Sequence, residues 1–125
     1  LQARILMKKA EEFVSKVLFD RDAAHIAHWK TDSLAQHMAL NTFYDAILEL
    51  IDGFVEQYQG YYRNRMDIKR QDGDDSDIRE LLEFRCEWIE MYRYQICDKD
   101  ETSLQNTIDE ILRQYESTQY MLTLQ

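Results

Sequence analysis

The sequence predicts an all-α protein, a four-helix bundle with one long crossover between the second and third helices. The chain of 125 residues has no proline and only three glycines. It therefore has few of the breaks that a many-turned β fold needs. Apolar residues recur three, four and seven positions apart in four segments, which is the period of an amphipathic helix. At this length we expect a single domain, residues 1–125, around one core.

The first predicted helix covers residues 3–29, with Ala10, Phe13 and Val17 on its apolar face. Ser33 followed by Gln36 fits a capping box and predicts the start of the second helix. Gly60 predicts its end. Two long helices that are joined by only about three residues must lie antiparallel.

Residues 60–76 are polar and charged, and they predict a surface connection with one short helical turn around 61–68. Its acidic residues do not match a calcium-binding EF-hand, because the glycine is misplaced and a glutamate at the twelfth position is missing. A solvated loop is therefore expected at Asp72, Asp74, Asp75 and Asp77. The third helix is predicted at 77–97 and the fourth at 102–123, where Thr102 and Gln105 fit a second capping box. Two helical hairpins with a long crossover have the connectivity of a ferritin-like bundle.

Composition excludes some classes of function. The net charge of −9, from 24 acidic and 15 basic residues, argues against binding to DNA or to an anionic membrane. No apolar run approaches the roughly 18 residues of a membrane span. Cys86 and Cys97 would lie about 16 Å apart along one helix, too far to pair within it. Two thiols without a disulfide framework favour a reducing compartment, so we expect a cytoplasmic protein.

The histidines and two carboxylates form the candidate site. All three histidines, His25, His28 and His37, precede residue 38, so the Glu-x-x-His pairs of a di-iron centre within one bundle are missing. His28 and His37 flank the tight connection and can approach each other. Asp52 and Glu56 share one helix face, but His37 lies about 22 Å from Asp52 along the helix. The four residues can share a metal only across an antiparallel two-fold contact through the second helix, which creates two equivalent sites.

This pattern resembles the Dps family, the ferritin-like mini-ferritins of starved bacteria. The residues that carry the resemblance are His28-Trp29, His37, Asn41, Asp52 and Glu56. The last segment, SLQNTIDEILRQYESTQYMLTL, is also similar to the last helix of that family. The chain departs from the family in three respects: the connection between the histidines is three residues shorter, an asparagine stands where Asp or Glu is usual, and the Lys-rich N-terminal arm that some members use on DNA is missing from this sequence.

The resemblance implies an iron-binding ferroxidase and iron-storage protein. Fe(II) would be oxidised to Fe(III) by hydrogen peroxide or oxygen at a site shared between two subunits, and stored in a shell of twelve. The implied ligands, which are also the catalytic residues, are His28, His37, Asp52 and Glu56. Trp29 would lie beside the site, and Asn41 would be at most a weak ligand for hard iron.

A second interpretation stays open, a catalytically inactive ferritin-like structural or interaction protein. Asn41 and the short connection leave room for it. The chain is also similar to the small, uncharacterised ferritin-like proteins that some tailed phages encode.

For His25 we expect an exposed or hydrogen-bonded role rather than a ligand role. Asp45 lies near the expected two-fold axis and is predicted to be solvated or paired, because burial without a partner is costly.

Overall fold

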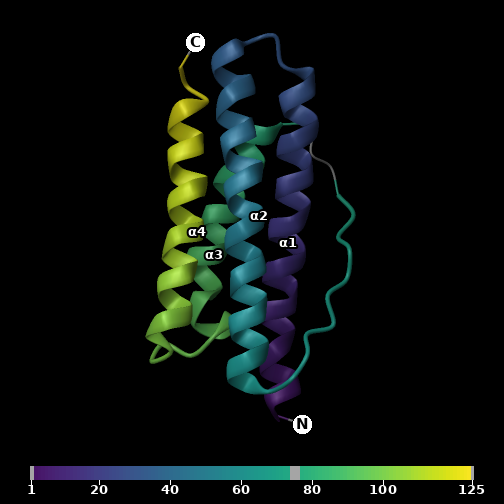
Figure 1. The fold of residues 1–125 in the computed structure, drawn as a ribbon, viewed down its shortest axis with the longest axis vertical. Coiled ribbons are helices and arrows are strands. Elements are labelled where there is room, and N and C mark those ends of the chain that lie inside the picture. The colour runs from purple at the N-terminus through teal and green to yellow at the C-terminus, as the bar shows by residue number, and fades with distance from the viewer. Residues whose placement is uncertain (1, 74–76, 125) are drawn as a thin grey trace.

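The structure is a computed structural model that describes residues 2–73 and 77–124, and it confirms the all-α four-helix bundle (Figure 1). Each helix packs against two others: α1 and α4 both contact α2 and α3. The side chains are described from Met7 onward. The helices are α1 (Gln2–Lys30), α2 (Leu34–Tyr62), α3 (Ile78–Ile96) and α4 (Thr102–Met121).

The core is built from one apolar row on each helix, as the helical spacing predicts. Aromatic rings meet edge to face across the rows, with 5.1 Å between the centroids of Phe13 and Phe54 and 5.0 Å between those of Phe43 and Tyr115. Burying each such side chain contributes roughly 1.5–3 kcal/mol. The fully buried rows include Phe13 and Val17, Phe43 and Ile47, Leu82 and Ile89, and Ile108 and Ile111.

The connection from α1 to α2 contains half of the predicted capping box. Ser33 is the N-cap, and its hydroxyl accepts a hydrogen bond from the Gln36 backbone N–H at 3.2 Å. The side chain of Gln36 does not return to Ser33. It accepts instead from the Thr31 hydroxyl at 3.0 Å, while the Ser33 N–H donates to Thr31 Oγ1 at 3.2 Å. The threonine therefore takes the place of the glutamine in closing this turn.

The end of α2 lies beyond the predicted stop. Gly60 is on the exposed face, and the helix continues to Tyr62 because the inner row continues through Tyr58 and Tyr62, whose rings lie 4.4 Å apart. The left-handed residue that ends the helix is Arg63, with φ 53° and ψ 42°, and its N–H donates to the Gln59 carbonyl. The short helical turn predicted around residues 61–68 is therefore wrong: its first two residues belong to α2.

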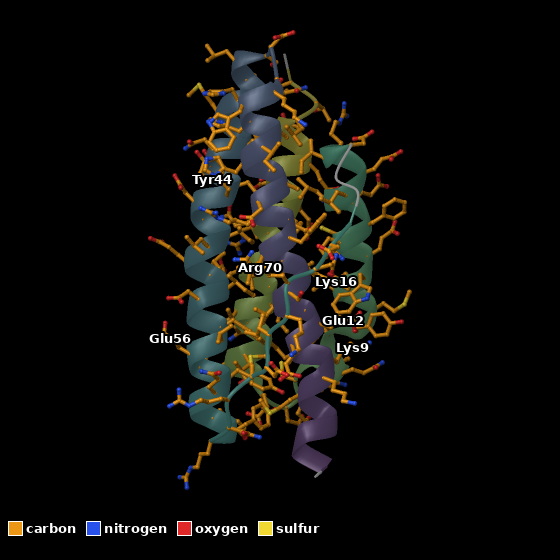
Figure 2. The ribbon with its side chains drawn as sticks, turned by 90° about the vertical axis from the view of Figure 1, so that its right-hand side faces the viewer. Lys9, Glu12, Lys16, Tyr44, Glu56 and Arg70 are labelled. Carbon is orange, nitrogen blue, oxygen red and sulfur yellow. The ribbon has the colours of Figure 1, made fainter. Side chains whose placement is uncertain are left out.

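Residues 64–73, called here the crossover segment, return along the outer side of α1 (Figures 1 and 2). The Glu11 carboxylate accepts a hydrogen bond from the Asp67 N–H, and the Ser15 hydroxyl donates to the Lys69 carbonyl at 2.5 Å. Asp74 and Asp75 of the predicted acidic loop lie outside the described residues. Because the crossover segment returns to the end where α2 began, α2 and α3 run in the same direction (Figure 1).

The third helix begins where the sequence predicts, but the capping box predicted for the fourth helix does not form. Asp77 is the N-cap of α3, and its carboxylate accepts from the N–H groups of Arg79 and Glu80. The capping box predicted for α4 is wrong, because the N-cap position is Glu101, which makes no side-chain cap. Gln105 is buried and donates instead to the Cys97 carbonyl at 3.0 Å. Its amide thus satisfies a carbonyl at the C-terminal end of α3.

Candidate functional site

His28 and His37 meet at the α1–α2 connection, as their positions in the sequence predict. Their rings stack with centroids 3.6 Å apart and planes 19° apart. His28 Nδ1 lies 2.7 Å from the His37 carbonyl oxygen, and His37 Nδ1 lies 2.8 Å from the His28 carbonyl oxygen. Since a carbonyl oxygen only accepts, each Nδ1 carries a hydrogen and donates it. The two residues therefore bind each other's backbone reciprocally.

This arrangement restricts what the histidine pair can do chemically. Each neutral ring keeps a lone pair only on Nε2, and that lone pair lies in the plane of the ring. Because the planes of His28 and His37 are nearly parallel and the ring centroids lie 3.6 Å apart, the two lone pairs lie in separate planes and converge poorly on one metal ion. The same contacts join the end of α1 to the start of α2, and each hydrogen bond contributes about 0.5–1.5 kcal/mol.

The other candidate side chains near the α1–α2 connection contact each other. The ring of His25 stacks between Tyr44 and Trp29, at centroid distances of 4.0 Å and 4.1 Å. The Tyr44 hydroxyl donates to Asn41 Oδ1 at 2.6 Å, and the Asn41 amide donates to Asp45 at 3.4 Å. His25 therefore has a packing role, Asp45 is exposed and paired, and Trp29 lies beside His25 with most of its ring in solvent.

Asp52 and Glu56 lie on the outer face of α2, far from the histidine pair within one chain. Figure 2 shows Glu56 well below Tyr44 on the same helix, pointing away from the bundle. The Asp52 carboxylate raises the pKa of Glu56, because it accepts a hydrogen bond from the protonated Glu56 carboxyl and because its charge disfavours a second carboxylate. Within the described residues, no three His, Cys, Asp or Glu side chains are grouped closely enough to hold a metal ion. The four-residue iron site therefore needs a second copy of the chain, and it stays a prediction.

The outer face of α2 is acidic over the middle part of the helix. Asp45, Glu49, Asp52 and Glu56 follow each other at intervals of four, three and four residues, and all are exposed. These intervals place them in one row. In an antiparallel contact between two copies of α2, the two rows would face each other, and like charges would oppose the contact unless cations bind between them.

A buried ionic network links α1, α3 and α4, and reasoning from the sequence missed it. Arg85 Nε donates to Asp20 Oδ2 at 2.6 Å and Nη2 donates to Oδ1 at 3.0 Å, while the Tyr115 hydroxyl donates to Oδ2 at 2.6 Å. Asp20 and Tyr115 are 0% exposed. Burial raises the pKa of Asp20, and the contacts of Arg85 and Tyr115 oppose that rise. Because no substrate reaches these atoms, the network is structural.

The two cysteines are free thiols with little reactivity. Burial raises the pKa of Cys86 to about 11 and that of Cys97 to about 12. Since the thiolate is the nucleophile and the metal ligand, neither cysteine is poised for chemistry near neutral pH.

In the described part of the chain, no helix is long and apolar enough to cross a membrane.

Comparison with known proteins places the chain in a family. A family model described as a family of unknown function, DUF5856, matches residues 28–122. The chain belongs to DUF5856. The match includes all residues of the motif from His28 to Glu56, and no Dps or ferritin-like family matches, so the resemblance to Dps is wrong. The motif was misleading because a histidine pair that closes a helical hairpin and an acidic solvated face produce the same spacing.

One relative of this DUF5856 chain is the "Uncharacterized 14.6 kDa protein in mobD-ri intergenic region" of Enterobacteria phage T4. The two sequences are 27% identical over 124 residues, which cover 94% of this chain and 90% of the relative. No solved structure matches. These comparisons assign no activity to the family or to the relative.

Proposed function

We propose that this protein is a non-catalytic structural or interaction protein, and that it is encoded by a phage. The observation that carries the proposal is the way the rings of His28 and His37 are held: each Nδ1 makes a reciprocal hydrogen bond, and the stack keeps the remaining Nε2 lone pairs in separate planes. The two residues with most potential for metal chemistry use their Nδ1 atoms to close the α1–α2 hairpin. In this reading, the histidines stabilise the scaffold, and the protein acts through its surface.

The geometry of the remaining predicted ligands supports this reading. Asn41 offers its carbonyl oxygen to Tyr44 rather than to a free site. Asp52 and Glu56 belong to an acidic row in solvent, where two copies of the chain would repel each other. Only cations bound between the rows would relieve that repulsion, and a shared iron site would also have to reach His28, which is buried.

The proposed phage origin rests on the T4 relative. The match extends over nearly the whole of both chains, so it reflects the complete bundle rather than one helix. A phage protein of this size that acts without catalysis would bind another protein, of the phage or of its host.

Anaerobic titration with Fe(II), followed by addition of hydrogen peroxide, tests the proposal. Iron oxidation stays the competing prediction. We expect no saturable Fe(II) binding and no rapid rise of Fe(III) absorbance, with the same result for Asp52→Asn. Saturable binding at about one or two irons per chain, with fast oxidation that Asp52→Asn abolishes, would overturn the non-catalytic reading.

The structural role of the histidine pair has its own test. His37→Gln removes the ring stack and one Nδ1–H donor, and the carbonyl of His28 loses its partner. We expect a loss of about 1–3 kcal/mol in the free energy of unfolding, measured by urea denaturation. Lys30→Gln, an exposed change at the end of the same hairpin, is the control and should change stability by less than about 0.5 kcal/mol. Equal effects of the two changes would contradict the structural role.

A further inference from the structure

The outer face of α3 carries an exposed apolar stripe. Phe84, Met91 and Tyr94 are 66%, 70% and 58% exposed. Their spacing of seven and three residues places them in one row on the helix, about 15 Å long. We call this row, with Glu87 between its members, the α3 outer face. Figure 2 shows α3 at one side of the bundle, with side chains that point away from the other helices.

No other helix of the described bundle covers the α3 outer face, although the guanidinium of Arg93 and the ammonium of Lys99 lie 5.8 Å and 5.9 Å from the centroid of the Tyr94 ring. The opposite side of α3 supplies Leu82, Ile89 and Ile96 to the core. On the side toward α1, the half-buried ring of Trp88 lies beneath the ammonium groups of Lys9 and Lys16, at 5.6 Å and 5.4 Å from the ring centroid. Three large side chains exposed to this extent present roughly 400 Å² of surface. An apolar patch of that size on a soluble protein commonly marks an interaction site.

The flank of the stripe is acidic and uncompensated. Glu80, Glu83, Glu87 and Glu90 project from α3, and none has an ion-pair partner within the part of the chain that the structure describes. The neighbouring groove between α3 and α4 adds Glu116. The basic side chains beside this flank are already paired, Arg93 with Asp109 at 2.6 Å and Arg113 with Glu110 at 3.6 Å. Arg79, at the start of α3, and Lys99, near Tyr94, are exposed and have no ion-pair partner among the described residues. The five glutamates outnumber these two cations, so the flank keeps a negative excess.

We propose, on the basis of the proposed function, that the α3 outer face binds a basic amphipathic helix of a different protein. Apolar residues of the partner at i, i+3 or i+4, and i+7 would cover Phe84, Met91 and Tyr94. Lysine or arginine on one flank would face the glutamates. A second copy of this chain is a poor occupant, because the glutamates of two α3 helices would face each other. The outer face of α2 is a poor docking surface for such a helix, since its row is mostly carboxylate.

The test uses a fluorescein-labelled amphipathic peptide of about 18 residues, long enough to span α3. Leucines occupy its apolar face and lysines one flank, and a second peptide has glutamates in place of the lysines. Each is titrated with the full chain, and binding is followed by fluorescence anisotropy at about 50 mM and about 300 mM salt. We expect the lysine peptide to bind, more weakly at high salt, and the glutamate peptide not to bind.

Matched variants locate the binding surface. Phe84→Ser with Met91→Ser should weaken binding of the lysine peptide at least about ten-fold, because the apolar anchors are lost. Glu83→Gln with Glu87→Gln should weaken it about three- to ten-fold and reduce its salt dependence. The controls are the same kinds of change on α2, Leu48→Ser and the charge-matched pair Asp45→Asn with Glu49→Gln. Binding to the controls should stay within about two-fold of the original affinity.

Three results would overturn the proposal. They are absence of peptide binding, equal losses for the α2 controls, and self-association of the chain that Phe84→Ser with Met91→Ser abolishes. The last result would assign the α3 outer face to a second copy. None of these three results is evidence about the proposed non-catalytic function, which the iron titration tests separately. Saturable iron binding would overturn that function whatever the peptide does.

Discussion

Asp20→Asn is expected to lower the free energy of unfolding by about 3–5 kcal/mol. The substitution keeps the size of the side chain but removes the charge that faces Arg85. The side chain of Arg85 is only 8% exposed, so its guanidinium has too little contact with water to replace the lost carboxylate. An unpaired charge in such a place costs far more than a lost neutral hydrogen bond, which is worth about 0.5–1.5 kcal/mol.

The expected loss is a large part of the whole stability, because a domain of this kind is stable by roughly 5–15 kcal/mol. It corresponds to a fall in melting temperature of roughly 10–20 °C. Tyr115→Phe should cost less, about 1.5–3 kcal/mol, since Asp20 keeps both hydrogen bonds from Arg85. Urea denaturation followed by circular dichroism measures both.

Two further variants test whether the unpaired charge of Arg85 causes the loss of stability. Asp22→Asn, two residues along the same helix, changes a carboxylate whose side chain is 72% exposed, and it should cost less than about 0.5 kcal/mol. Asp20→Leu combined with Arg85→Met removes both charges and should recover most of the stability that Asp20→Asn loses. If Asp20→Asn costs under about 1 kcal/mol, or if the double variant is no more stable than it, the network does not hold the helices together as described.

Three smaller predictions follow from the thiols, the α2 carboxylates and the end of α2. Cys86 and Cys97 should react slowly with a disulfide reagent near pH 8, because burial raises their pKa values to about 11 and about 12, and unfolding in urea should release both. Asp52→Asn should lower the pKa of Glu56, which the Asp52 carboxylate raises, as followed by carboxyl NMR shifts. Arg63→Gly should raise stability by about 0.5–1 kcal/mol, because glycine adopts φ 53° without strain.

Each of these has an internal control. Asp45→Asn, three turns before Glu56 on α2, should leave the titration of Glu56 unchanged, and an equal shift would mean that the effect is not local. Arg65→Gly changes the crossover segment where φ is not positive, so it should not stabilise the protein. Rapid thiol reaction in the folded state would contradict the raised pKa values of the half-buried Cys86 and the buried Cys97.

The sequence predicted the third helix almost to the residue, because local chemistry sets its ends. Asp77 offers its carboxylate to the first N–H groups of α3, and such a cap is legible in the sequence alone. The local sequence does not indicate the end of α2 in this way. Gly60 looked like a stop, but the inner face continued through Tyr62, and packing against the bundle outweighed the weak helix propensity of glycine.

The buried network had a signal in the sequence that was not used. Asp20 lies three residues after Val17 and four before Ala24, and Arg85 lies three after Leu82 and four before Ile89. Both charged residues therefore sit in phase with the apolar rows, which predicts burial and a charged partner. The sequence does not show that Asp20 and Arg85 pair with each other. They are 65 positions apart, and only the packing of α1 against α3 brings them together.

The candidate site shows a different limit. The sequence correctly placed His28 beside His37, since a short connection fixes their separation. It could not give the direction of the rings or the atoms they bind, and these decide whether the pair is open to a metal. The spacing of Asp52 and Glu56 fits both a ligand pair and a solvated face, and only their surroundings distinguish the two.

The length of the crossover segment has a consequence for the electrostatics of the whole bundle. Each α-helix has a macrodipole, positive at its N-terminus, and neighbouring helices favour opposite directions. Because the chain returns along α1 before α3 begins, α1 and α4 run one way and α2 and α3 the other (Figure 1). Every packed pair, α1 with α2 and α3, and α4 with α2 and α3, therefore has opposed dipoles. A short turn in place of the crossover, with the same helices in contact, would align the dipoles of α1 with α3 and of α2 with α4.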